Sequence, residues 1–185
     1  MTALIIIGVV LLALVLMYNS LVGKKNQIEN ISGSVDAVLK KRYDLIPNLV
    51  SSVQQYMAHE KGLLNNITEL RAKAMKPDLS DHDKITLDKE ITSALGSILV
   101  AVENYPDLKA NQNVMHLQRT LHEVEAQISA ARRAYNQAVT DYNNAIEMIP
   151  TNFMASMMNY QRKEVFTIPE TERQNVNVND LFSKK

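Results

Sequence analysis

The side chains best suited to metal chemistry in this chain are its four histidines, since the sequence contains no cysteine. A helix that binds one metal ion through two histidines places them three or four residues apart. His116 and His122 are six residues apart and face different sides of a helix, while His59 and His82 are isolated. The spacing therefore predicts no metal site.

Two further groups of residues invite a chemical interpretation. Met154, Met157 and Met158 could hold soft copper, but such a cluster more often fills gaps in a core, and we favour a core role. Glu123 and Glu125 are two residues apart on a predicted helix, so they cannot face each other. The sequence has no glycine-rich phosphate loop and no G-x-S-x-G motif. We expect no catalysis and no cofactor.

One basic residue, Arg42, falls on the apolar stripe of its predicted helix. Its guanidinium could reach water while its stem covers the core. Alternatively it is buried or lies at an interface, paired with an acid such as Asp44 or Glu60 or one on a facing helix. Elsewhere the 20 basic and 20 acidic residues cancel, so the overall charge does not favour nucleic acid as a partner.

The element that must position everything else is the apolar run at the start of the chain. Between Leu4 and Leu21 the sequence carries no charge, and about 20 apolar residues are what a helix needs to cross a bilayer. Tyr18 and the pair Lys24-Lys25 follow, as is usual where such a helix leaves the membrane. A cleaved signal peptide would need a basic residue before the run and a small-residue site after it, and neither is present. We predict a transmembrane anchor over residues 1–22.

The remaining chain has the periodicity of long helices. Apolar residues three or four apart predict one helix without a stop from Met17 to Lys73, kinked at Pro47. A loop around Pro77 ends it, and Ser80 with Asp83 predicts the start of a second helix.

That second helix should end before the pair Tyr105-Pro106, because a residue before proline avoids helical geometry. A heptad stripe from Val114 to Tyr142 predicts a third helix that starts near residues 110–113 and stops at Pro150. A shorter helix is expected around residues 152–160.

These elements predict an all-α fold. An N-terminal transmembrane helix should continue into an antiparallel bundle of three long helices plus a short C-terminal helix. The predicted organisation is an anchor over 1–22, a bundle domain over 23–160 and an extended tail over 161–185.

Several blocks of sequence resemble the LemA family of bacterial membrane-anchored proteins. They are Leu39–Val50 with the letters LKKRYDLIPNLV, Tyr56–Glu60, Tyr105–Asn111 with YPDLKAN, and Ala131–Asn136. The resemblance implies a single N-terminal span and a bundle of long helices. It brings no activity and no catalytic or metal-binding residue.

The matching residues can still be assigned structural roles. We predict that Asp44, Asn48, Arg132 and Asn136 form a polar cluster across the bundle at the level of Pro47. The residues for which we expect a structural role are Asp44, Pro47, Asn48, Tyr105, Pro106, Arg132, Tyr135 and Asn136.

Two functions are compatible with this sequence. The first is a membrane-anchored interaction scaffold that assembles into a homo-oligomer and binds protein partners that the sequence does not identify. Ile28, Ile31 and Val35 are the candidate interface, unless the third helix covers them. The alternative is an accessory subunit of a membrane enzyme or transport system with a polar site of its own.

The basic residues between Lys24 and Arg42 follow the span, and only the α-amine precedes it. By the positive-inside rule the N-terminus should lie outside and the helical domain in the cytoplasm of a bacterial cell membrane. A periplasmic or extracellular domain is the alternative.

Overall fold

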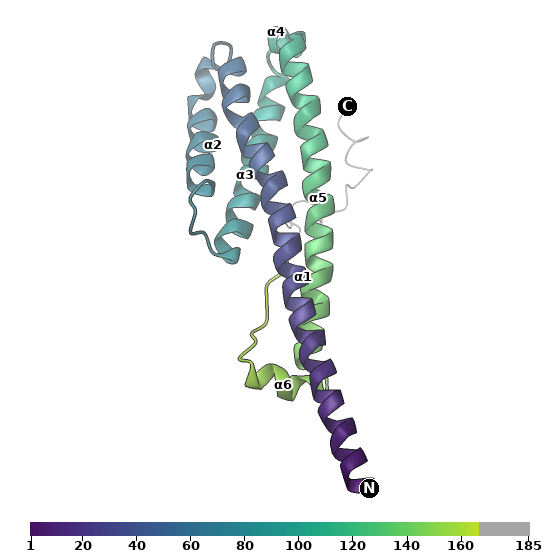
Figure 1. Ribbon diagram of the computed structural model, residues 1–185. Coiled ribbons are helices and arrows are strands. Elements are labelled where there is room, and N and C mark those ends of the chain that lie inside the picture. Colours follow the sequence, from purple (N-terminus) through teal and green to yellow (C-terminus); the bar gives the residue numbers. More distant parts are fainter. Residues whose placement is uncertain (167–185) are drawn as a thin grey trace, which may run out of the picture.

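The computed structural model describes residues 1–166, and within them it contains six α-helices and no strand. Four helices run alternately up and down in Figure 1, with α4 linking two of them at the end far from the N-terminus and α6 crossing the near end. The predicted all-α bundle with a long N-terminal helix is confirmed. In chain order the elements are α1 (Thr2–Val53), the 3-10 turn η1 (Ala58–Glu60), α2 (Lys61–Ala74), α3 (Asp81–Val102), α4 (Pro106–Lys109), α5 (Gln112–Glu147) and α6 (Thr151–Met157).

The single helix predicted from Met17 to Lys73 is in fact two antiparallel helices. α1 ends at Val53, the chain reverses through η1, and α2 returns beside α1 (Figure 1). The apolar stripe continues through the reversal, because Val53 and Met57 are both fully buried. Periodicity alone therefore gave no sign of the turn. Pro47 lies inside α1, and the helix continues through it.

The other predicted helix starts are confirmed by their caps. The Ser80 hydroxyl accepts a hydrogen bond from the backbone N–H of Asp83 at 3.1 Å and so caps α3. The side-chain oxygen of Asn111 accepts from the backbone N–H groups of Asn113 and Val114 at the start of α5. Both caps satisfy donors that a helix leaves unpaired in its first turn.

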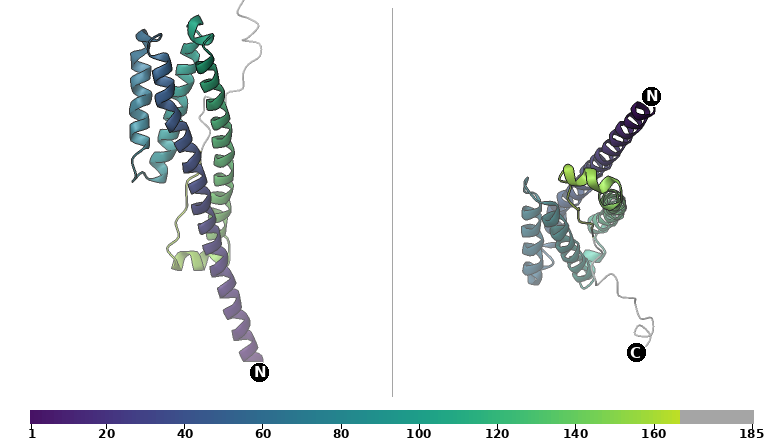
Figure 2. Two further views of the ribbon diagram at one scale, coloured as in Figure 1. Left: turned by 45° about the horizontal axis from the view of Figure 1, so that its top comes forward. Right: turned by 90° about the horizontal axis from the view of Figure 1, so that it is seen from below.

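The core lies mainly along the seam between α1 and α5, and α2 and α3 pack as a second antiparallel pair (Figures 1 and 2). The heptad stripe predicted for α5 is buried, including Ile128 and Tyr135. On α1 the matching positions Leu39, Ile46 and Leu49 are also buried. Each such side chain stabilises the fold by roughly 1.5–3 kcal/mol relative to an exposed one.

The beginning of α1 projects beyond the bundle (Figure 1). Its side chains from Thr2 to Leu16 are exposed, and within the described residues α1 is the one helix long and apolar enough to cross a membrane. Leu21, in contrast, is fully buried. The helix therefore passes without a break from an uncovered apolar stretch into the core.

Candidate functional site

A buried network of charges joins α1, α3 and α5 in the middle of the bundle. Arg42 is fully buried, and its Nη2 donates to Asp88 Oδ1 at 2.6 Å. Its Nη1 donates to Glu125 Oε1 at 2.9 Å and to Thr92 Oγ1 at 3.0 Å. Arg132 forms an ion pair with the second oxygen of Asp88. Of the two interpretations of Arg42 made from sequence, the structure shows the buried pair, with its acids on facing helices.

The network balances two positive charges with two negative ones. Burial, the largest single influence, lowers the pKa of Arg42, but the carboxylates of Asp88 and Glu125 together outweigh it and leave that pKa raised. Arginine also stays protonated under ordinary conditions, so this group cannot act as a base. Taking one partner away from such a pair would leave an uncompensated charge in the core. The network is therefore suited to fixing how the three helices sit against one another.

The position of Asp88 in the sequence also indicates a buried charge. It lies on the apolar stripe of α3, between Ile85 and Ile91, as Arg42 lies on the stripe of α1. Opposite charges on the buried stripes of two helices predict that they meet, because an unpaired charge there is costly. Glu125, which is about one-third exposed, gave no comparable signal.

Pro47 leaves a gap in the hydrogen bonding of α1, and α2 fills it. Proline has no N–H to donate to the carbonyl of Tyr43 four residues earlier. The Nε of Arg71 donates to that carbonyl at 2.8 Å. A helix from elsewhere in the bundle thus satisfies the acceptor that Pro47 frees, and the position of α2 along α1 is fixed.

Two asparagines of α5 hold the end of the described chain. The Asn143 side chain accepts from the backbone N–H of Lys163 at 3.0 Å and donates to its carbonyl at 2.9 Å. Asn136 makes the same pair of bonds with Phe166, at 2.8 and 2.7 Å. Seven helical residues rise about 10.5 Å, and three extended residues span about 10 Å, so the two spacings match. Part of the predicted tail, residues 161–166, therefore lies along the bundle, and its remainder, 167–185, is outside the described residues.

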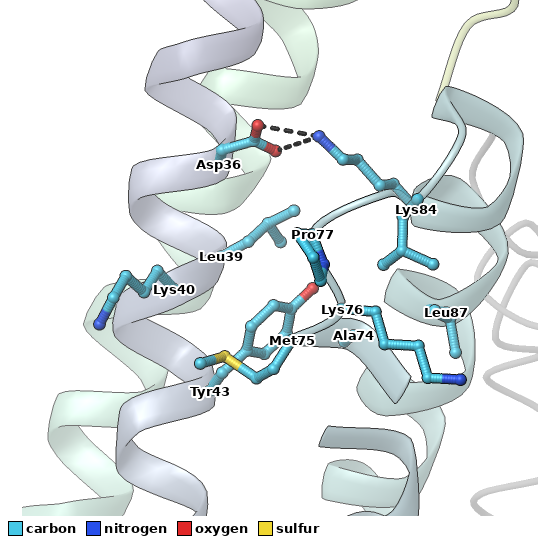
Figure 3. A pocket seen from close by; sticks show the side chains of 11 residues that line it. Asp36, Leu39, Lys40, Tyr43, Ala74, Met75, Lys76, Pro77, Lys84 and Leu87 are labelled. Atoms are coloured by element: carbon cyan, nitrogen blue, oxygen red, sulfur yellow. Dashed lines mark hydrogen bonds and ion pairs between the residues drawn. The ribbon is translucent and has the colours of Figure 1, made fainter. Parts of the chain in front are cut away.

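A surface hollow of about 230 Å³ lies between α1 and the loop that joins α2 to α3. Figure 3 shows the ring of Tyr43 extending from α1 toward Pro77, with Asp36 and Lys84 paired beside it. Burial raises the pKa of Tyr43, so its hydroxyl remains protonated and able to donate. The hollow is thus lined by both apolar and polar side chains, and it lies apart from the buried network.

The four-residue cluster predicted around Pro47 is not brought together. Asp44 is exposed and binds Lys40 at 2.6 Å on its own helix, and Asn48 is exposed as well. Arg132 binds Asp88 and Asn136 holds Phe166. The helix of each residue was predicted correctly. The prediction was wrong about Asp44 and Asn48, which face solvent rather than the interior of the bundle.

The other residues of the matching blocks contribute to helix starts or to the core. Pro106 is the first residue of α4, and Tyr105 before it is half-buried against the core. Tyr135 is buried, and its ring meets that of Phe166 edge to face, with centroids 5.2 Å apart.

The candidate interface of Ile28, Ile31 and Val35 is part of the interior. Ile28 and Val35 are buried, and Ile31 is partly buried against the core. The reason is that α5 returns along this part of α1 and covers it, as Figure 1 shows. The alternative stated from the sequence is therefore the observed one, and these residues offer no free surface.

The potential metal ligands are scattered. His59, His116 and His122 are exposed, and His82 bonds with Glu164 at 3.0 Å. In the part of the chain that the structure describes, no three His, Cys, Asp or Glu residues gather as a metal site would require. The core role favoured for the methionines is wrong for Met157, which is 84% exposed on α6.

Comparison with known proteins finds similarity over most of this chain. The sequence model of the LemA family matches residues 32–179. Protein LemA of Metamycoplasma hominis is 29% identical over 163 residues, which cover 88% of this chain and 74% of that protein. Magnetosome protein MamQ 2 of Paramagnetospirillum magneticum is 22% identical and MamQ of Magnetospirillum gryphiswaldense 21%, each over 83% of this chain and 65% of the relative.

Proposed function

Because the chain belongs to the LemA family, we propose that it is a membrane-anchored scaffold that holds a helical bundle at the membrane for other proteins to bind, without catalysis of its own. One observation carries the proposal. A single helix, α1, is uncovered and apolar at one end and is the central core helix at the other. A soluble protein would expose this apolar stretch to water, whereas a bilayer would cover it.

The buried network supports a structural role for the bundle. Its two arginines and two carboxylates lie among three helices and hold their relative positions, which keeps the outer surface of the bundle fixed in shape. A fixed surface binds a partner without the loss of freedom that a flexible one would suffer. The relatives include proteins named for magnetosomes and one that is not, so their names do not tie the shared region to one reaction.

We place the anchor in the bacterial cell membrane, with the N-terminus outside and the bundle in the cytoplasm. The bias of basic residues after the span supports this orientation. A reporter fused at Lys185 that is active only in the cytoplasm would agree with it. Activity only outside the cytoplasm would reverse the orientation and leave the anchorage intact.

The scaffold proposal includes self-association into a homo-oligomer, which must use a surface other than the covered stripe of α1. Light scattering of the full-length protein in mild detergent should give a mass of several chains. A monomer would remove self-association from the proposal.

The test of the scaffold itself is capture of the full-length protein from membranes, followed by mass spectrometry of bound proteins. Two variants make the result specific. Replacing residues 3–20 by an unrelated membrane-spanning helix should keep the partners, while Arg42→Met, which destabilises the bundle, should reduce the amount captured. Partners that follow the span rather than the bundle would contradict the proposal.

The hollow between α1 and the α2–α3 loop favours a second candidate, an accessory subunit with a polar site. Lys40, Lys76 and Lys84 line the hollow together with Asp36 and the Tyr43 hydroxyl. Substitution of Tyr43 by Phe removes that hydroxyl and keeps the ring. Loss of a captured partner on this change alone, with stability unchanged, would favour the accessory role.

A further inference from the structure

An apolar patch covers the outer side of α6 and the turn that leads into it from α5. The patch consists of Met148, Ile149, Phe153 and Met157, which are 63%, 78%, 67% and 84% exposed. Phe153 and Met157 are four residues apart and so share one side of the helix. The opposite side carries Ala155, which is buried against the rest of the bundle. α6 therefore packs on the bundle through Ala155 and turns Phe153 and Met157 outward.

This α6 patch differs from the other exposed apolar side chains of the described bundle. Outside the span, those side chains are single residues on separate elements, which is ordinary for a protein surface. Residues 148–160 also contain no charged side chain, and the two charges that flank this stretch, Glu147 and Arg162, form an ion pair at 2.5 Å. An exposed apolar face without charge is one feature of a helix that lies at a lipid surface.

The position of α6 is as informative as its composition. In the view from below in Figure 2, α6 lies across the end of the bundle, beside α1 where that helix leaves it. Leu21 is fully buried at this level, and the Lys25 ammonium lies 5.8 Å from the ring centre of Tyr160, just after α6. The 20 residues from Thr2 to Leu21 rise about 30 Å, the thickness of the hydrocarbon core.

We propose that α6 lies in the interface of the bilayer that holds α1, with the α6 patch inserted among the outer parts of the acyl chains. This inference rests on the proposed membrane anchorage. The span fixes the height of the bundle, and at that height α6 meets the lipid. Lys24, Lys25 and the Arg162–Glu147 ion pair then stand at the level of the headgroups. The protein would contact the membrane at two places, one that crosses it and one that lies on it.

The sequence contains no tryptophan, so one introduced tryptophan reports on one site. The full-length variant Phe153→Trp is placed in vesicles of phosphatidylcholine brominated near the start of the acyl chains, which quenches only tryptophans in contact with lipid. We expect emission at short wavelength and loss of most of the fluorescence. Met157→Trp should behave alike, and it serves as the second variant if the first does not fold.

Two controls separate this inference from the anchorage on which it rests. Tyr18→Trp lies on the span and should be quenched, whereas Val100→Trp, exposed on α3 near its far end, should not. Quenching at position 18 without quenching at 153 and 157 would overturn the placement of α6 and leave the anchor standing. Absence of quenching at all three would overturn both proposals.

The same measurement identifies a different occupant of the α6 patch. If a second copy of the chain covered it, tryptophan at 153 would emit at short wavelength but would not be quenched by brominated lipid. Emission at long wavelength without quenching would show the patch in water. Either result contradicts the bilayer as the occupant.

Discussion

The two halves of α1 share one hydrogen-bonded backbone but need different surroundings. From Thr2 to Leu16 the side chains are apolar on all sides and exposed. From Leu21 to Val53 one stripe is buried by other helices, and the stripe includes the fully buried Arg42 with its two carboxylate partners. The inner half is covered by the same chain, whereas the outer half has no cover within the described residues and is long and apolar enough to cross a bilayer. The helix alone does not determine its environment, and the side chains around its circumference do.

The largest effect on the inner half is expected from Arg42→Met. This change keeps most of the volume but removes a charge, so Glu125 loses its arginine and Asp88 keeps only Arg132. Breaking a buried pair costs about 3–5 kcal/mol. Urea unfolding in mild detergent, followed by circular dichroism, should show this loss in the free energy of unfolding.

Lys40→Met is the matched control for that experiment. Lys40 lies two residues earlier and is paired with Asp44 on the surface. Exposed pairs contribute about 0–1 kcal/mol, so stability should hardly change. Equal losses for Lys40→Met and Arg42→Met would contradict the importance of burial.

Ile28→Ala tests whether the stripe near the membrane is core or interface. Truncation of a buried isoleucine should lower the free energy of unfolding by about 2–5 kcal/mol. Asn30→Ala, at an exposed position two residues on, should leave it nearly unchanged. If Ile28→Ala separated an oligomer without loss of stability, the burial of this stripe by α5 would be the wrong explanation.

Leu11→Arg tests the outer half. A charged residue at the centre of a span opposes insertion by about 2.5–3.5 kcal/mol, so the protein should shift from the membrane to the soluble fraction. The bundle should unfold at the same urea concentration as before, because residue 11 touches none of its core. Leu11→Ile keeps the side chain apolar and should remain in the membrane. Retention of Leu11→Arg would argue against a span.

A smaller effect is expected at the start of α3. Ser80→Ala removes the hydroxyl that caps the Asp83 N–H and should cost about 1 kcal/mol of stability. Ser97→Ala, within the same helix and exposed, should change stability by less than about 0.5 kcal/mol. If the two losses were equal, the cap would have no special weight.

The smallest effect concerns pH. The hydrogen bond and charge of Glu164 raise the pKa of His82 above its ordinary value. The pair therefore contributes fully below the unfolded pKa, and its contribution disappears as pH rises through the raised folded pKa. An NMR titration should give His82 a pKa above the ordinary value of a histidine, and Glu164→Gln should lower it. If the pKa of His82 were the same with and without Glu164→Gln, the result would count against the pair.

Most of the fold could be predicted because the apolar spacing and the capping residues of long amphipathic helices are visible in the sequence. Ser80 and the stripe from Val114 to Tyr142 located α3 and α5 well. The turn after Val53 could not be found, since Met57 continues the stripe while its backbone reverses. When the turn after a helix also buries an apolar side chain, the spacing of apolar residues continues through the turn. The end of the helix then cannot be recognised from that spacing.

The candidate site was less predictable, because its contacts join distant segments. Arg42 could be recognised as unusual, and Asp88 on a facing stripe was available as its partner. The asparagine contacts left no such trace. Asn136 binds the backbone of Phe166 and Asn143 binds the backbone of Lys163. Any residue supplies such backbone groups, so the sequence does not mark the partner.

The length of α1 also determines how far the end of the bundle lies from the apolar N-terminal stretch. The stretch from Leu21 to Val53 is about 48 Å long at 1.5 Å per residue. The turn after α1 and the short helix α4 both lie at the far end of that length (Figure 1). With the span in a bilayer, anything that binds there is held that far from the lipid surface. Since α1 is helical from Thr2 to Val53, we expect the bundle to act as a spacer that carries a tilt of the span toward its far end.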